Sequence, residues 1–313
     1  MIRQAVPTAS LDTMLASLSN NTLKQYEVTF KIWWHYCQEN RMDALCSSVP
    51  KIMQFLSIQF NKGASYGTLN SHKSALSLII GSRIGKDERI KRLLKGFYKS
   101  KPPMPRYKAT WNPSIVLNTL KTWHPCSSLS LETLTKKVVT LIALCTAQRV
   151  QTLSLMKISN ITCLESGIHI NITDLIKTSA PDRPQPVLAL PFYKETEICP
   201  AASLQYYINY TKDIRNTIDN LFITTKRPYK AATPSTLSRW IKTTLKNSGI
   251  DTNIFKSHSV RHASTSSASI KGVSIDIIRN TAGWTGSSQT FAKFYNRPIV
   301  RDPNNFANTI LSL

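Results

Sequence analysis

The stretch HSVRHASTSSASIKGVSIDIIRNTAGWTGSSQTFAKFYNRP, residues 258–298, carries the strongest pattern in the sequence. It contains His258 and Arg261 three residues apart, Trp284 directly after a glycine, and Tyr295 among basic residues. The three-residue spacing places His258 and Arg261 on one side of a helical turn. A chain rich in basic residues often contains such a pair by chance. The stretch therefore fits either packed helices or an anion site beside a nucleophile, and the rest of the sequence decides between them.

The charge of the chain indicates a polyanionic partner. Its 313 residues include 40 Lys and Arg against 17 Asp and Glu, which gives a net charge of +23. Nucleic acid is the commonest partner of so basic a protein. A generally basic surface or an acidic protein partner is the alternative. The length and the 42% hydrophobic content are sufficient for two globular domains.

Several other classes of protein are excluded by the composition. No apolar run approaches the roughly 18 residues of a membrane span, and the first 15 residues lack the apolar core of a secretory signal. The six cysteines form neither a C-x-x-C pair nor a zinc-type spacing with histidine. We therefore expect no membrane association and a reducing intracellular compartment.

The hydrophobic pattern divides the chain into two domains and a linker. Apolar residues recur at three- and four-residue steps over 19–40, 49–63, 65–81 and 86–100, which predicts four N-terminal helices. Residues 101–112 combine prolines and cations without an apolar period, as linkers do. Beyond them, helices are expected over 131–149, 200–214, 233–249, 259–272, 274–283 and 287–296, and strands at 167–173, 186–192 and 220–224. The predicted fold is mainly α with a small β-sheet (α+β), with a helical domain over 1–100 and a second domain over 113–313.

A basic cluster covers the last N-terminal helix and the linker. Only Asp87 and Glu88 oppose its positive charges. We interpret it as a surface that lies along a DNA phosphate backbone, although a solvated helix face is the alternative. The cluster comprises Lys86, Arg89, Lys91, Arg92, Lys95, Lys99, Lys101, Arg106 and Lys108.

Two further basic residues stand at positions typical of an active site. Arg149 closes a hydrophobic helix in CTAQRVQTL, and Lys177 follows a predicted strand in NITDLIKTSA. Taken singly, each has an ordinary explanation, namely an arginine that reaches solvent from a helix end and an exposed hairpin lysine. Likewise, Trp284 alone fits a core aromatic residue, and Tyr295 is one of 11 tyrosines.

Together, these side chains could carry out phosphoryl transfer. Two arginines can bind the oxygens of one phosphodiester, and a histidine and an indole N–H can donate to the same oxygens. A tyrosine phenol can attack the phosphorus, and a flexible lysine can protonate the leaving 5′ oxygen. Because cations already neutralise the phosphate, we expect neither a metal nor another cofactor.

This set of residues resembles the tyrosine recombinase (phage-integrase-type) family. The family's order is an arginine, a lysine on a β-hairpin, His-x-x-Arg, a histidine or tryptophan, and the nucleophilic tyrosine. Segments such as TAQRVQTLSLMKISNI and HSVRHASTS are similar to the family's motifs. The segments AQRVQTL and AGW…FAKFYNRPI look most like those of recombinases from eukaryotic mobile elements, of the DIRS/Ngaro and Crypton kinds. In order, the positions fall on Arg149, Lys177, His258, Arg261, Trp284 and Tyr295.

The resemblance implies a fold, an activity and an assembly. The N-terminal helices are similar to the family's SAM-like core-binding domain, and residues 113–313 to its catalytic domain with a C-terminal tail. The implied activity is DNA strand cleavage and rejoining through a 3′-phosphotyrosine, in site-specific recombination or integration. The implied partner is double-stranded DNA, bound by a homo-tetramer on two sites, with a monomer or dimer in its absence. The tail, through Phe306, Ile310 and Leu311, is expected to dock either on a neighbouring subunit or on its own domain.

Two departures from the family pattern affect the expected site. The family often has an acidic residue three positions after the first arginine, where this chain has Thr152, so either other groups brace the arginines or the site is looser. The spacing from Trp284 to Tyr295 is also longer than in many bacterial members. His262 matches a frequent family histidine, for which the resemblance implies a supporting role.

Three other functions fit parts of the sequence. A type IB topoisomerase shares the chemistry but lacks the N-terminal bundle, and a domesticated DNA-binding protein would have lost cleavage. An RNA-binding helical protein would require the six ordered positions to be accidental. If the mobile element is eukaryotic, the protein is expected in the nucleus; otherwise, it is expected in the cytoplasm.

Overall fold

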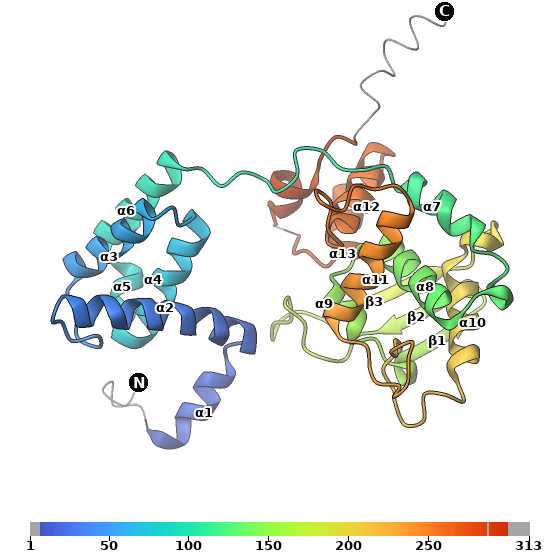
Figure 1. Cartoon of the computed structure of the whole chain (residues 1–313), viewed down its shortest axis with the longest axis horizontal. Coiled ribbons are helices and arrows are strands. Elements are labelled where there is room, and N and C mark those ends of the chain that lie inside the picture. Colours follow the sequence, from blue (N-terminus) through green and yellow to red (C-terminus); the bar gives the residue numbers. More distant parts are fainter. Residues whose placement is uncertain (1–6, 287, 300–313) are drawn as a thin grey trace, which may run out of the picture. The chain divides into compact units, whose positions relative to one another are not determined.

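The computed structural model describes residues 7–286 and 288–299, in two compact units that divide after Met104 (Figure 1). Both units are built mainly of helices, and the second adds one three-stranded sheet. The predicted class, mainly α with a small β-sheet, is confirmed. Among the described residues, no helix has both the length and the apolar character to cross a membrane. The tail over 300–313 lies outside the described residues, and its docking stays a prediction.

Unit 1 is a helical bundle around its own apolar core. The core is formed by aromatic and aliphatic residues such as Trp33, Phe55 and Leu76. Its helices are α1 (Thr8–Ala16), α2 (Asn20–Glu39), α3 (Val49–Asn61), α4 (Tyr66–Ile80), the short α5 (Arg83–Lys86) and α6 (Glu88–Ser100). The four helices predicted from periodicity correspond to α2, α3, α4 and α6, whereas α1 and α5 were not expected.

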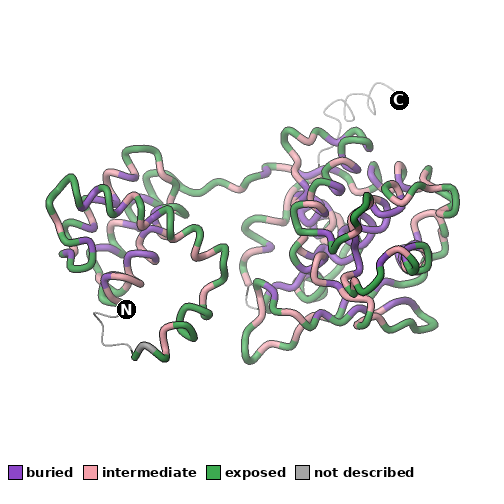
Figure 2. The backbone as a smooth tube through the Cα atoms, turned by 60° about the horizontal axis from the view of Figure 1, so that its bottom comes forward, coloured by how far each residue is buried: buried purple, intermediate pink, exposed green. Residues whose placement is uncertain are grey.

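Unit 2 packs helices against a small sheet around a larger core. Its longer helices are α7 (Pro113–Thr122), α8 (Leu131–Thr146), α10 (Pro200–Thr211), α11 (Pro234–Asn247) and α12 (Ser259–Ile270), with the shorter α9 (Val150–Ser154) and α13 (Ile275–Ala282). The 3-10 turns η2 (Cys126–Ser128), η3 (Ile158–Asn160) and η4 (Thr196–Ile198) connect them, and a π-helix, η5, spans Phe291–Tyr295. Buried segments lie inside this unit (Figure 2), and in α8 most of the residues are buried.

The sheet of unit 2 is antiparallel, in the order β1 (Ile161–Leu164), β2 (Gly167–Asn171) and β3 (Val187–Pro191). Helices α8 and α10 pack against β3. Gly167 opens β2 with a positive φ of 153°, and a Cβ there would lie 2.3 Å from the carbonyl oxygen of Leu190, so only glycine fits. The 15 residues from 172 to 186 form the loop between β2 and β3.

Local sequence explains where these helices begin. Ser19, Ser65 and Ser130 each accept a hydrogen bond from the backbone N–H three residues later, which satisfies a donor left free at the helix start. Helices α3, α7, α10 and α11 have proline in their first two positions, where its missing N–H costs nothing.

In unit 2, helix α7 was not expected, and the structure differs from the predicted elements in other places as well. Residues 220–224 form only isolated bridges, at Asn220 and Ile223, because no neighbouring strand runs beside them. Strand β1 was missed, since only one of its four residues is even partly buried and it has no apolar alternation. The expected helix over 287–296 is reduced to the five-residue π-helix.

The segment expected to be a linker is partly built into unit 2. Tyr107, Thr110 and Trp111 are buried, and the indole N–H of Trp111 donates to Ser259 Oγ on α12 at 2.9 Å. The backbone N–H of Thr110 donates to the carbonyl of Pro298 at 2.8 Å, and Thr110 and Ile299 form a parallel bridge. The aromatic residues among the prolines and cations are the signal that the interpretation as a linker overlooked.

Candidate active site

Five of the six expected catalytic residues line one open cleft of about 820 Å³ in unit 2. The sixth, Arg261, lies behind the cleft wall, with its guanidinium carbon 4.0 Å from the centre of the Trp284 ring and 5.4 Å from that of Tyr295. Segments far apart in the chain therefore meet here. The five residues are Arg149, Lys177, His258, Trp284 and Tyr295.

The hydroxyl of Tyr295 is held by a histidine. Nε2 of His258 lies 2.7 Å from the Tyr295 oxygen, at hydrogen-bond distance. The ring of His262 stacks on the Tyr295 ring, with centroids 4.1 Å apart and planes 16° apart. Tyr107 packs edge-on against the same imidazole, at 5.0 Å. Tyr295 is thus held by its hydroxyl and by one ring face, which orients it towards the cleft.

Arg261 is almost fully buried and is fixed by backbone carbonyls. It is 2% exposed, and its Nη1 donates to the carbonyls of Ala147 and Ala282, each at 2.6 Å. Its Nε and Nη2 are buried without a hydrogen-bond partner in the structure. Since buried donors are nearly always satisfied, these two are available to an anion in the cleft.

Arg149 and Lys177 occupy opposite kinds of position in the same cleft. Ala147 takes a left-handed conformation (φ 48°) at the end of α8, and Arg149 follows as the residue before α9. The Arg149 side chain is half-buried, whereas Lys177 is exposed in the β2–β3 loop. A half-buried arginine and an exposed lysine on a long, flexible side chain suit a phosphate ligand and a proton donor, respectively.

Trp284 is placed by the end of α13. Gly283 ends that helix with a φ of 69°. The chain turns there, so that the Trp284 side chain packs in a small apolar cluster with Ile278 and Phe291. The indole is 5% exposed, lies 4.8 Å from the Tyr295 ring, and has an Nε1 without a hydrogen-bond partner. Like the two free donors of Arg261, this N–H is available to a bound anion.

Thr152 lies buried on α9, at 1% exposure, where the family often has an acidic side chain. Within residues 7–286 and 288–299, no carboxylate forms an ion pair with Arg149 or Arg261. The two carbonyls that bind Arg261 provide the bracing instead. This keeps the site strongly positive, because a carbonyl orients a guanidinium without neutralising it.

Burial and neighbouring cations control the protonation of the site. Burial, followed by Arg261 and Arg149, lowers the pKa of His258 to about 4. Burial, followed by His258, lowers the pKa of His262 to about 3. Burial and then Arg149 lower the pKa of Arg261 to about 9, which still leaves it charged at neutral pH. At neutral pH, both histidines are therefore neutral, and His258 can accept the phenol proton.

Acid is expected to destabilise the fold through these histidines. From the ordinary histidine pKa of 6.5 down to the folded values, the unfolded chain binds more protons than the folded chain, so stability falls with falling pH. The contribution is complete above about pH 6.5 and is lost towards about pH 4. Urea unfolding of the wild type should show a lower midpoint near pH 5 than near pH 7.

His262→Phe provides the control for this prediction. It keeps an aromatic ring against Tyr295 but cannot take up a proton, so its urea midpoint should depend less steeply on pH than that of the wild type. An identical slope in the two proteins would contradict the assignment of the effect to His262.

The same cleft contains basic residues that the sequence reasoning missed. Arg239 and Lys242 of α11 line it, next to Ser235 and Ser238. Helix α11 is amphipathic: Trp240 is buried, whereas Arg239 and Lys242 are exposed. This polar face is the feature of the sequence that could have indicated these two residues. These residues extend the positive surface beyond the Tyr295 region.

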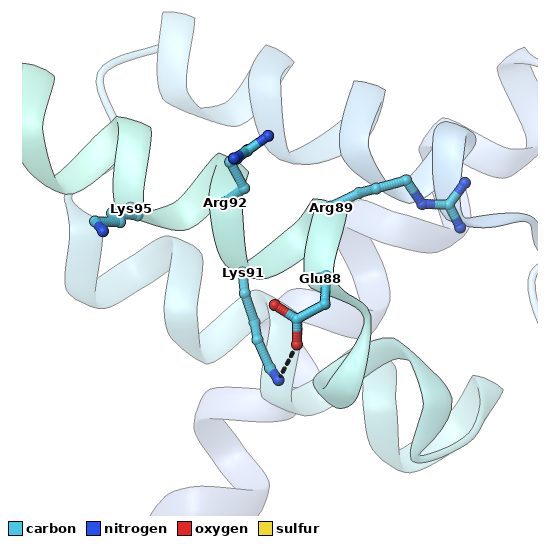
Figure 3. Close-up of a pocket in the computed structure, with 5 residues that line it drawn as sticks. All are labelled: Glu88, Arg89, Lys91, Arg92 and Lys95. Atoms are coloured by element: carbon cyan, nitrogen blue, oxygen red, sulfur yellow. Dashed lines mark hydrogen bonds and ion pairs between the residues drawn. The ribbon is translucent and has the colours of Figure 1, made fainter.

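The predicted DNA-binding cluster is divided between the two units. In unit 1, α6 carries Arg89, Lys91, Arg92, Lys95 and Lys99, all exposed, and the first four line a shallow hollow of about 490 Å³ with Glu88 (Figure 3). Lys86 ends α5, and Lys101 donates to the carbonyl of Gly63 at 3.2 Å. In unit 2, Arg106 and Lys108 are exposed, and the charge of Arg106 contributes to the lowered pKa of His258.

Two of the α6 cations are already paired. Arg89 donates to both carboxylate oxygens of Asp87, and Lys91 lies 2.7 Å from Glu88. Arg92, Lys95 and Lys99 form no ion pair with any described residue. In Figure 3, Arg92 and Lys95 point away from the Lys91–Glu88 pair. Among the cations of α6, these three unpaired ones are therefore the best suited to bind phosphates.

The sequence of unit 2 identifies the class of protein. Residues 117–299 match the family model described as the phage integrase family. The match spans more than half of the 313 residues, so the chain belongs to the phage integrase family. None of the curated proteins matches the chain.

In the part of the chain that the structure describes, no cluster of three or more His, Cys, Asp or Glu residues could hold a metal ion.

Solved structures share the fold at low sequence identity. A lambda integrase tetramer bound to a Holliday junction is 18% identical, with a TM-score of 0.55 over 93% of this chain and 76% of the other. XerH recombinase bound to difH, before cleavage, is 16% identical, with a TM-score of 0.59 over 92% and 78%. The Tn1549 transposon integrase in complex with transposon right-end DNA is 15% identical, with a TM-score of 0.61 over 96% of each chain.

Proposed function

We propose that this protein cuts and rejoins duplex DNA at specific sites through a covalent 3′-phosphotyrosine formed by Tyr295. The observation that carries the proposal is the contact of 2.7 Å between the Tyr295 hydroxyl and His258 Nε2, beside the buried donors of Arg261. Membership of the phage integrase family supports the same reaction.

Each side chain has a defined part in the proposed reaction. The Tyr295 oxygen attacks the phosphorus, and its proton passes to the neutral His258. The bond from phosphorus to the 5′ oxygen breaks, and Lys177 supplies the proton that this oxygen takes up. Arg149, Arg261 and Trp284 stabilise the charge on the pentavalent phosphorus. Attack by the 5′ hydroxyl of a partner strand reverses the step, so the energy of the bond is retained.

A covalent-trapping experiment tests the proposal. The protein is mixed, in EDTA, with nicked duplexes made from the DNA that flanks its own gene, and the products are separated on denaturing gels. A slow protein–DNA band is expected, and EDTA should not reduce it. Salt-sensitive binding without any band would instead favour a domesticated DNA-binding protein. Relaxation of supercoiled DNA without strand exchange would favour a type IB topoisomerase.

We also propose that the unpaired cations of α6 bind the DNA backbone. Replacing Lys95 and Lys99 by glutamine should lower the salt dependence of DNA binding, by about 0.9 in the log–log slope for each phosphate that the protein no longer neutralises. Lys31→Gln is the matched control in the same unit, because Lys31 is exposed on α2 and paired with Glu27. The slope, measured by fluorescence anisotropy between low and moderate salt, should not change in the control. Equal slopes in all three proteins would contradict the assignment.

The assembly and the origin of the protein form part of the proposal. We infer a homo-tetramer on two DNA sites, with a monomer or dimer in its absence, which is supported by the tetramer in which lambda integrase was solved on a Holliday junction. We also infer a eukaryotic mobile element of DIRS/Ngaro or Crypton type as its source, and hence a nuclear location. The supporting features are the segments AQRVQTL and FAKFYNRPI. Light scattering with and without DNA, and microscopy of a tagged protein, test these two points.

A further inference from the structure

Helix α12 touches the nucleophile at three successive turns. His258, just before the helix, binds the Tyr295 hydroxyl, and His262 stacks on its ring. Four residues further along the same face, Ser266 is fully buried and contacts the backbone around Tyr295. Its Oγ donates to the Tyr295 carbonyl at 2.6 Å and accepts from the Arg297 N–H at 3.0 Å. Residues four apart share one helix face. His258, His262 and Ser266 therefore form one row, which contacts the hydroxyl, the ring and the backbone of Tyr295, respectively.

The Ser266 hydroxyl is used differently from those of its neighbours on the chain. A serine or threonine inside a helix commonly donates to the carbonyl four residues earlier. Thr265 does so, donating to the carbonyl of Arg261 at 2.7 Å. Ser266 instead donates to another segment, at the point where the π-helix ends and its last carbonyls lack helical partners. Its hydroxyl therefore satisfies the carbonyl of Tyr295 itself and the backbone N–H two residues further on.

We propose that Ser266 is a positioning residue that sets where the Tyr295 hydroxyl stands in the cleft. This inference rests on the proposed function, because it assigns Ser266 a part in that reaction. Without the hydroxyl, the Tyr295 carbonyl and the Arg297 N–H lose their partner, and the residues after the π-helix can shift. A displacement of about 1 Å at a reacting atom is sufficient to lower a rate by about a hundredfold.

The test compares Ser266→Ala with Ser264→Ala. Ser264 lies on the same helix, and its hydroxyl is buried without a hydrogen-bond partner, so its removal breaks no hydrogen bond. The first measurement is hydrogen exchange of the full-length protein without DNA. Ser266→Ala should speed exchange over residues 291–299, and Ser264→Ala should not. The second is the single-turnover rate of covalent adduct formation on the nicked duplex, alongside the Kd for DNA and the Tm.

Ser266→Ala should lower the cleavage rate by between about ten- and a hundredfold, with a Kd and a Tm close to those of Ser264→Ala. A purely structural role would lower the Tm and leave the rate of the folded protein unchanged. Ser266→Cys keeps the shape of the side chain, with a larger sulfur atom and a much weaker hydrogen bond, and should show the same loss of rate if the alanine variant folds poorly.

The outcomes separate this inference from the proposed function. Equal cleavage rates in Ser266→Ala and Ser264→Ala would overturn the positioning role while the proposed function stands. No adduct in any protein, including the wild type, would count against the proposed function. In that case, the exchange of residues 291–299 would still decide: unchanged exchange in Ser266→Ala would overturn the proposal that Ser266 holds this segment.

Discussion

Replacement of Tyr295 by phenylalanine is expected to abolish covalent adduct formation and to leave DNA binding intact. The substitution removes the only atom that would bond to phosphorus and the partner of His258 Nε2. The ring contacts with His262 and Trp284 persist, so the fold and the cleft should remain. Denaturing gels with nicked DNA measure the adduct, and anisotropy measures the Kd.

Phe294→Tyr in the Tyr295→Phe background provides a stringent control. Phe294 is the preceding residue and is 39% exposed, so this double variant restores a phenol one position away from the held hydroxyl. We expect no recovery of cleavage, because no histidine binds the new hydroxyl. Cleavage by Tyr295→Phe at the wild-type rate would refute Tyr295 as the nucleophile.

Arg261→Ala is expected to produce the second large effect, on both catalysis and stability. The loss of its free donors should lower the cleavage rate by about a hundred- to a thousandfold. The same change leaves the carbonyls of Ala147 and Ala282 without their donor and opens a cavity at a residue that is 2% exposed. The free energy of unfolding should therefore fall by about 2 kcal/mol or more. Single-turnover kinetics and urea unfolding measure the two effects.

Arg149→Ala separates the two effects. Arg149 lines the cleft but is only half-buried, and its only hydrogen bond among the described residues is at its backbone carbonyl, which accepts from Leu153. Its removal should therefore lower the cleavage rate to a similar extent, by about a hundredfold, with little change in the free energy of unfolding. If Arg149→Ala destabilises the protein as much as Arg261→Ala does, then it is wrong that Arg149 only binds the anion whereas Arg261 also stabilises the fold.

The class of the fold and the composition of the site could be predicted because both are recorded in local patterns. Helical periodicity revealed the long helices, and the order of six residues revealed which side chains would meet. The sequence could not show how Arg261 is held, because its partners are backbone carbonyls of Ala147 and Ala282, 114 and 21 residues away. Carbonyls belong to every residue and leave no sequence signature, so Thr152 could not show whether other groups brace the arginines or the site is looser.

The elements that were missed depend on tertiary contacts. Strand β1 is stabilised by pairing with β2 rather than by its own apolar pattern. The π-helix that ends at Tyr295 begins with Phe291, which packs into the apolar cluster with Ile278 and Trp284, and these contacts come from elsewhere in the chain. Ser266 is one serine among several in STSSAS, and only the structure distinguishes it from Ser264.

The hydrogen bond between Thr110 and Pro298 connects the first residues of unit 2 to the segment after Tyr295. The chain enters this unit at Pro105, and five residues later Thr110 lies beside Pro298 and Ile299, which follow Tyr295 closely in the chain. Residues 107–111 therefore form part of the wall behind the cleft, because Tyr107 packs on His262 and Thr110 binds the segment that follows Tyr295. A change in this short entry segment would reach Tyr295 through these two contacts.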